Sequence, residues 1–183
     1  MAVLALTPGG SKLAAHIADN LEGSSLYLPA KEAGSFGGAH PFTDFHKTFA
    51  KCVEEHEGLV CVMATGIVVR LLAPLLNSKE EDPAVVVADE MGRNVISLLS
   101  GHLGGANRLA RKVAAITGGG EVITTATDIQ GKISFDELAK QAGLVIENLD
   151  RVKTMNMALL KQGQIGLYDP GNWLRPHIPQ ATG

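Results

Sequence analysis

The sequence is poor in aromatic residues, since phenylalanine, tryptophan and tyrosine together make up only 4% of its 183 residues. This scarcity argues against a surface that stacks nucleic-acid bases on aromatic rings. Positive charge is not in excess either, because the formal net charge is −3, whereas non-specific binders of nucleic acids usually have a basic excess. We therefore expect no nucleic-acid partner.

Cysteine is equally scarce, and long hydrophobic runs are absent. The two cysteines, Cys52 and Cys61, have no metal-ligand or CxxC spacing, and the six histidines form no HxxxH or HxH pair, so we expect no protein metal site. No segment approaches the roughly 18 uninterrupted apolar residues of a membrane span. The first apolar run is too short for a signal peptide. These absences predict a cytoplasmic protein without a membrane partner.

Apolar runs and helical spacing alternate along the chain. Unbroken runs typical of strands buried on both faces occur at Val3–Leu6, Leu59–Ala64 and Ala84–Ala88. Helical spacing is found over Gly10–Leu21, Pro41–Glu55, Gly66–Leu76 and 103–117. The segment Gly66–Leu76 is apolar almost all round, which predicts a buried helix.

The second half continues the alternation more weakly. Strands are predicted at Val95–Leu99, Val122–Thr125, Leu144–Glu147 and Gln164–Tyr168, and helices at Ser134–Ala142 and Val152–Lys161. The whole pattern predicts an α/β fold: a mainly parallel sheet flanked by helices in Rossmann-like layers, with a small second α/β segment. We place an N-terminal α/β domain at residues 1–127, followed by a second segment and tail at 128–183.

Chemistry is expected where strands lead into helices, because ligands of open α/β sheets bind beyond the carboxyl ends of strands. Four such exits carry small or polar residues: "LTPGGSK", "MATGIVVR", the stretch from "ADEMGR" to "SGHLGGAN", and "ITTATD". Glycines at helix starts expose backbone amides that suit carboxylate or phosphate groups. No P-loop, GxGxxG or GxSxG motif is present, so tight turns without a ligand are an equal alternative for any one exit.

Five polar side chains at these exits are candidates, each with a plainer alternative. His102 stands among glycines and could transfer protons near pH 7 or ligate a metal, or it could be structural. Asp89 and Glu90 follow a buried strand, where such a pair also initiates turns. Arg70 is the only charge on an apolar helix, and we favour an anion over solvent as its partner. Asp128 could simply cap a turn.

Three segments, "MATGIVVRLLAPLL", "DPAVVVADEMGRNVISLLSGHLGGANRLA" and "VITTATD", resemble signature blocks of the CbiG family of cobalamin biosynthesis proteins, and the match extends over roughly residues 1–168. The resemblance implies cobalt-precorrin-5A hydrolase activity in anaerobic vitamin B12 synthesis. In this reaction the δ-lactone of cobalt-precorrin-5A opens and acetaldehyde leaves, giving cobalt-precorrin-5B. The substrate carries the cobalt, so no cofactor is expected.

For that reaction we expect His102 to act as the base or the activator of water, with Asp89 or Glu90 assisting it. A rival role for His102 is axial ligand to the substrate's cobalt. Residues that are small, polar or cationic would bind the substrate's carboxylates and the developing oxyanion. They are Thr65, Gly66, Arg70, Gly101, Gly104, Gly105, Asn107, Thr124, Thr125 and Asp128.

Two other functions stay open. Family members usually continue into a further C-terminal domain, so the chain could be a non-catalytic corrinoid-binding half whose partner is a CbiG-like domain on another chain; a homo-oligomer is the other arrangement considered. Without the resemblance, the residues also fit a small α/β module that binds a phosphorylated or carboxylated metabolite. Selective binding of a cobalt tetrapyrrole would separate the first two functions from this one.

Overall fold

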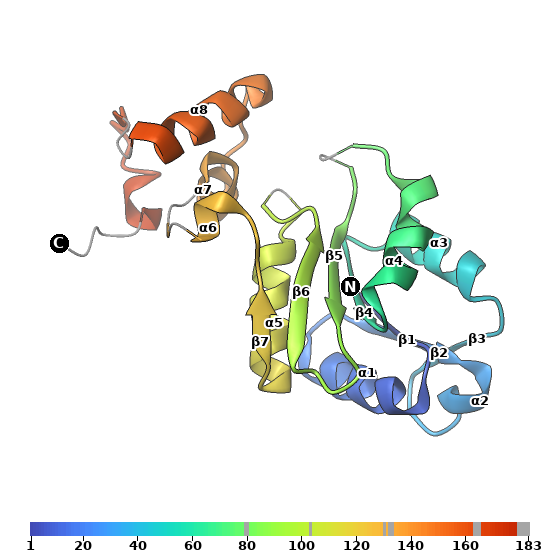
Figure 1. Cartoon of the computed structure of the whole chain (residues 1–183). Coiled ribbons are helices and arrows are strands. Elements are labelled where there is room, and N and C mark those ends of the chain that lie inside the picture. The colour runs from blue at the N-terminus through green and yellow to red at the C-terminus, as the bar shows by residue number, and fades with distance from the viewer. Residues whose placement is uncertain (79–80, 103, 130, 132–133, 163–165, 179–183) are drawn as a thin grey trace. The chain divides into compact units, whose positions relative to one another are not determined.

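The computed structural model describes residues 1–78, 81–102, 104–129, 131, 134–162 and 166–178 (Figure 1). The chain divides into two compact units, Met1–Ile123 and Thr124–Gly183. The first unit contains a seven-stranded sheet in the order β3-β2-β1-β4-β5-β6-β7. Its strands are β1 (Ala2–Ala5), β2 (Ser25–Pro29), β3 (His40–Phe42), β4 (Gly58–Val62), β5 (Ala84–Ala88), β6 (Asn94–Leu99) and β7 (Gly120–Val122).

The sheet is mainly parallel, as expected for the α/β class. Strands β3, β2, β1, β4 and β5 pair in parallel, with Val3 of β1 opposite Leu26 of β2 and Val60 of β4. The exception is β6, which pairs antiparallel with β5 and parallel with β7. The last two strands therefore run opposite to the other five, which determines where the loops that follow them lie.

Helices cover both faces of the sheet (Figure 1). One face packs against α1 (Pro8–Asn20), α2 (Ala30–Ala33) and α5 (Ala106–Thr117). The opposite face packs against α3 (Phe45–Glu55) and α4 (Thr65–Leu72), which continues as a short 3₁₀ turn, η1 (Ala73–Leu75). This three-layer arrangement confirms the predicted fold class.

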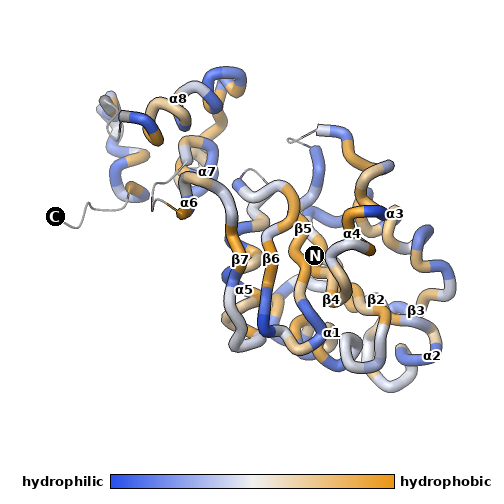
Figure 2. Tube along the Cα trace, viewed as in Figure 1, coloured by the Kyte–Doolittle hydropathy of each residue, from blue (hydrophilic) through white to orange (hydrophobic). Residues whose placement is uncertain are grey.

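The predicted apolar runs form the centre of this sandwich. Every residue of β1, β4 and β5 is buried, and Figure 2 colours β4 and β5 as hydrophobic. Successive side chains point to opposite faces, so Val3 joins the core beneath α1 and α5 while Leu4 joins the core beneath α3 and α4. Strands buried on both sides need this unbroken apolar composition.

The cysteines belong to the second of these cores. Cys52 and Cys61 are both buried, and burial raises the pKa of Cys52 to about 11 and the pKa of Cys61 still further. Thiolates at neutral pH are therefore disfavoured at both positions, which argues against a nucleophilic role for either side chain.

Three strands and one helix face differ from the expectation. Strand β7 covers Gly120–Val122, whereas the strand predicted there covered Val122–Thr125. Strand β2 and the short edge strand β3 were not predicted, and Pro41 lies in β3 and not in the first turn of a helix. Helix α4 is also not buried all round: Ile67 is 38% and Val69 48% exposed. Only its Val68 side faces the sheet, so the apolar outer face is left uncovered by described residues of the first unit.

The described residues of the second unit form helices and no strand. These are α6 (Ala126–Ile129), α7 (Phe135–Gln141), α8 (Leu149–Gln162) and a 3₁₀ turn, η2 (Arg175–His177). The predicted strand at Leu144–Glu147 is wrong, because these residues instead line an apolar groove with α7 and α8. Of the strand predicted at Gln164–Tyr168, residues 164 and 165 lie outside the described residues and 166–168 are not in a strand.

Among the described residues, no helix combines the length and the apolar composition that crossing a bilayer requires.

The core beneath α3 and α4 supplies a test of the fold. Phe49 is fully buried against the sheet, so Phe49→Ala should lower the free energy of unfolding by about 3–5 kcal/mol through lost burial and a cavity. Phe45 is only partly buried, and Phe45→Ala is the matched control with a smaller expected loss. Urea denaturation followed by circular dichroism measures both; equal losses would contradict the packing described.

Candidate functional site

The crevice of the first unit lies where the order of the strands reverses. The chain proceeds from β1 outward to β2 and β3 and then returns to β4, on the other side of β1. Ligands of open α/β sheets bind beyond the carboxyl ends of the strands at such a reversal. The loops that flank this crevice begin at Leu6 after β1 and at Met63 after β4.

Glu90 reaches into this crevice from the neighbouring strand. It follows β5, yet its Oε2 accepts a hydrogen bond of 2.7 Å from the Thr7 hydroxyl in the loop after β1. Because β4 lies between β1 and β5, this contact passes above the end of β4. A side chain at Gly9 would collide with the Glu90 carboxylate. The crevice therefore contains an exposed carboxylate held at the first turn of α1, where the helix dipole favours negative charge.

The starts of α1 and α4 differ in how their amides are satisfied. Thr7 caps α1 by accepting a 3.0 Å hydrogen bond from the backbone N–H of Gly10. At α4 the capping residue is Ala64, and no described side chain caps the helix. The first amides of a helix have no partner within the helix, so the start of α4, at Thr65 and Gly66, is the better place for a ligand oxygen.

A cavity of about 370 Å³ adjoins the start of α4. It extends over the face of β5, β6 and β7 beside that helix, and its lining residues are Met63, Ala64, Thr65, Val87, Asp89, Asn94, Ile96 and Val122. Gly66 has no atom within 4 Å of the place where its Cβ would be, so packing does not require a glycine there. An open glycine beside an uncapped helix start leaves room for a ligand to approach the backbone.

Asp89 lies in this cavity but is held by its own turn. Its carboxylate accepts hydrogen bonds from the backbone N–H groups of Met91 (2.9 Å), Arg93 (3.3 Å) and Asn94 (2.6 Å), and from the Asn94 side chain. Partial burial tends to raise the pKa of Asp89, but these hydrogen bonds outweigh it and lower the pKa below its ordinary value. The geometry thus supports turn formation as the role of Asp89.

His102 does not lie with these acids, and the expected grouping with Asp89 or Glu90 is not formed. Since β6 is antiparallel to β5, the loop after β6 lies at the opposite end of the strands from the loop after β5. The Ser100 hydroxyl there donates to the carbonyl of Asp82, ahead of β5. Four exits were predicted beyond the carboxyl ends of strands, but the carboxyl ends of β6 and β7 lie at the opposite end of the sheet from those of β1, β4 and β5.

The glycines of "SGHLGGAN" are needed by the loop itself. A side chain at Gly101 would meet the Asn107 amide at 2.9 Å, and one at Gly104 would meet Ser100. Gly105 has φ 87°, a left-handed conformation that favours glycine. The packing of this loop therefore accounts for its three glycines without a ligand.

At the start of α5, the backbone amides are likewise bonded to the protein's own carbonyl groups. Ala106 N–H donates to the Ser100 carbonyl at 3.1 Å, and Asn107 N–H donates to the Gly101 carbonyl at 3.0 Å. The Asn107 side chain is 2% exposed and accepts a 2.6 Å hydrogen bond from the Ser97 hydroxyl. These contacts assign Asn107 a role in holding the loop.

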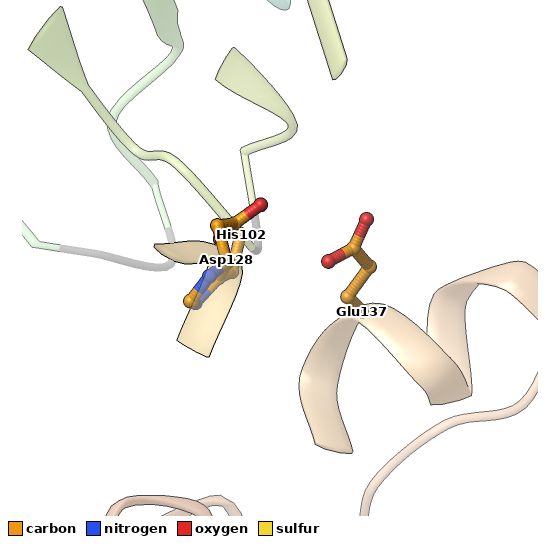
Figure 3. Close-up of side chains that lie close together, drawn as sticks. All are labelled: His102, Asp128 and Glu137. Carbon is orange, nitrogen blue, oxygen red and sulfur yellow. The ribbon is translucent and has the colours of Figure 1, made fainter. Parts of the chain in front are cut away.

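In the second unit, polar side chains gather at the starts of two short helices (Figure 3). The Thr125 hydroxyl donates to the Asp128 carboxylate at 2.7 Å, and Thr124 is exposed ahead of α6. Carboxylate oxygens of Asp128 and Glu137 lie within 4.8 Å of each other. Two carboxylates by themselves are too few ligands for a metal site. His102, also drawn in Figure 3, belongs to the first unit.

Sequence reasoning missed Thr7 and Glu137. Both were marked by recognisable signals. Thr7 precedes Pro8, and a threonine before a proline is typical of a helix start. Glu137 stands three residues after Ser134, whose hydroxyl accepts from its N–H at 3.4 Å, the spacing of a capping box.

Two family models match the chain. Residues 47–128 match the model described as cobalamin synthesis G N-terminal, and residues 133–182 match the cobalamin biosynthesis central region. A solved structure of a cobalamin biosynthesis protein G homologue from Sulfolobus solfataricus has a TM-score of 0.54 and 24% sequence identity, over 93% of this chain and 51% of that one. At this identity the likeness supports the fold alone.

Three relatives carry names that refer to one activity. The chain is 44% identical over 170 residues to the cobalt-precorrin-5A hydrolase of Salmonella typhimurium, covering 92% of this chain and 48% of the relative. It is 37% identical to the Priestia megaterium protein of that name and 32% identical to a Methanocaldococcus jannaschii relative with a similar name. The chain therefore spans about half the length of these relatives.

The turn held by Asp89 predicts a pH dependence of stability. Because the folded state lowers the pKa of Asp89, its stabilisation should be present above the ordinary carboxyl pKa of about 3.9 and lost as the pH falls through the folded value. Asp89→Asn should cost about 1 kcal/mol at pH 7, allowing for solvent screening, and less at pH 3. Urea denaturation at both pH values measures this; a cost independent of pH would refute the role.

Proposed function

Since the chain carries the N-terminal and central regions of the CbiG family, we propose that it acts in the cobalt-precorrin-5A hydrolase reaction of cobalamin biosynthesis. The observation that carries this proposal is the 44% identity to a protein of that name over 92% of the chain. The substrate would be cobalt-precorrin-5A and the products cobalt-precorrin-5B and acetaldehyde. The cobalt belongs to the substrate.

The crevice at β1 and β4 offers groups suited to the lactone step. Water must lose a proton as it attacks the lactone carbonyl carbon, and the carbonyl oxygen then carries negative charge until the ring C–O bond breaks. The Glu90 carboxylate, oriented by the Thr7 hydroxyl at 2.7 Å, would take that proton. The uncapped amides at Thr65 and Gly66 would stabilise the oxygen.

The second step releases acetaldehyde and needs a base for the carbinol proton. As this proton leaves, the bond between the carbinol carbon and the macrocycle breaks, and the electron pair passes into the ring system, which then takes up a proton. Glu90, having passed its first proton to the alkoxide that leaves the lactone carbonyl, would serve again as the base. His102 is the rival base or a ligand to the substrate's cobalt, in which case the reacting edge would face the other end of the sheet.

The second candidate function is a corrinoid-binding half without activity of its own. It is favoured by one observation, that the chain spans only 46–48% of the relatives' length. In that case a partner of the kind that forms the rest of the relatives would complete the active site.

Anaerobic incubation of the chain with cobalt-precorrin-5A, with measurement of acetaldehyde and product mass, tests the hydrolase. We expect acetaldehyde, and a rate at least about a hundredfold lower for Glu90→Gln, because general-base catalysis contributes about that much. Glu57→Gln, an exposed acid before β4, is the control. Substrate that binds but does not react would favour the binding half. A loss with His102→Gln but not with Glu90→Gln would move the base to His102.

A pair of glycine variants separates ligand contact from packing. Gly66→Ala should keep or slightly raise stability, since its Cβ meets nothing within 4 Å and alanine favours a helix by about 1 kcal/mol, but it should weaken substrate binding. Gly101→Ala should lower stability because its Cβ would press on Asn107 at 2.9 Å. Thermal melting and binding titrations measure both effects. Unchanged binding by Gly66→Ala would count against the crevice.

A further inference from the structure

A second groove of the first unit lies between α3 and α4, on a different flank of α4 from the cavity at its start. Its volume is about 370 Å³, and its lining residues are Phe45, His46, Phe49, Ala50, Ile67, Arg70, Leu71, Pro74 and Leu75. The rings of Phe45 and Phe49 meet edge to face at 5.9 Å and form an aromatic wall. Ile67, 38% exposed, contributes an aliphatic surface from α4.

The charge in this groove has one sign. Arg70 is exposed on α4, and among the described residues it has no acidic partner. None of the described residues that line the groove carries a carboxylate. His46, on α3, adds a ring nitrogen that can donate a hydrogen bond. An arginine whose planar guanidinium is not engaged by the protein is well suited to a carboxylate, which it can hold through two parallel hydrogen bonds.

We propose that the α3–α4 groove binds the carboxylate-bearing edge of a flat apolar ligand, with Arg70 on the carboxylate and the wall of Phe45 and Ile67 against the apolar ring. The identification of this ligand as a carboxylated tetrapyrrole rests on the proposed function. The groove itself requires only an apolar body and an acidic group.

The dimensions favour a small ligand over a protein partner. A volume of about 370 Å³ is at the lower end of small-molecule sites, enough for one edge of a macrocycle. Helix α4 also links the groove to the crevice: Thr65 begins the helix and Arg70 follows five residues later, a rise of about 7.5 Å. A tetrapyrrole is wider than this, so one molecule can place a rim carboxylate at Arg70 while another part of its rim meets the start of α4.

Binding titrations with two corrin probes test the charge recognition. Cobyrinic acid has free carboxylates around its rim, whereas in cobinamide they are amides. Wild type should prefer cobyrinic acid, and Arg70→Gln should weaken that binding roughly tenfold and remove the preference, since it loses a charge-assisted hydrogen bond. Arg108→Gln changes an exposed arginine of α5 and should leave both affinities unchanged. Equal affinities of Arg70→Gln and wild type for cobyrinic acid would overturn the proposal.

The apolar wall is tested with a matched pair on one helix. Ile67→Asp places a negative charge inside the groove, whereas Val69→Asp places the same charge on the same helix outside it. Both positions are exposed, at 38% and 48%, so both variants should fold. Only Ile67→Asp should weaken cobyrinic acid binding. Equal effects of the two variants would overturn the groove as the binding surface.

Fluorescence of anilinonaphthalene sulfonate, an aromatic anion unrelated to corrins, separates the groove from the proposed function. If this dye binds in a manner that depends on Arg70 and Ile67 but cobyrinic acid does not bind, the groove stands and the corrinoid function fails. If cobyrinic acid binds with no dependence on either residue, the groove fails and the corrinoid function stands. Failure of both probes to depend on Arg70 overturns the inference.

Discussion

The turn between β5 and β6 is the constraint on which the arrangement of the functional residues depends. Asp89 holds it by accepting hydrogen bonds from the amides of Met91, Arg93 and Asn94. This short connection makes β6 run antiparallel to β5. As a result, the loop with His102 lies at one end of the strands. Glu90, one residue after Asp89, lies at the other end, beside the carboxyl ends of β1 and β4.

The glycine-rich turns at the two ends of the strands are of two kinds. In the loop that contains Gly101, the missing side chains make room for the protein's own Asn107, and the first amides of α5 already have carbonyl partners. At the start of α4 neither condition holds, because Gly66 faces open space and no described side chain caps the helix. A glycine-rich turn thus indicates a ligand only where the structure has not used the space and the amides itself.

The sequence predicted some elements better than others, for physical reasons. Strands β1, β4 and β5 are buried on both faces, so their apolar runs are unbroken and easily recognised. Strand β3 is three residues long with a proline and exposed residues, a composition that loops share. At Leu144–Glu147 the apolar run is present, but a strand needs a neighbour to satisfy its backbone, and the described part of the second unit offers helices instead.

By itself, the sequence determined the α/β class, the buried central strands, and the resemblance to a family, because each of these depends on local composition, periodicity or residue identity. Only the tertiary structure decided that β6 reverses direction, that Glu90 meets Thr7 across the end of β4, and that Arg70 faces a groove with α3. These are relations between segments far apart in the chain. They depend on the pairing of strands and the packing of helices, for which no spacing within one segment carries the information.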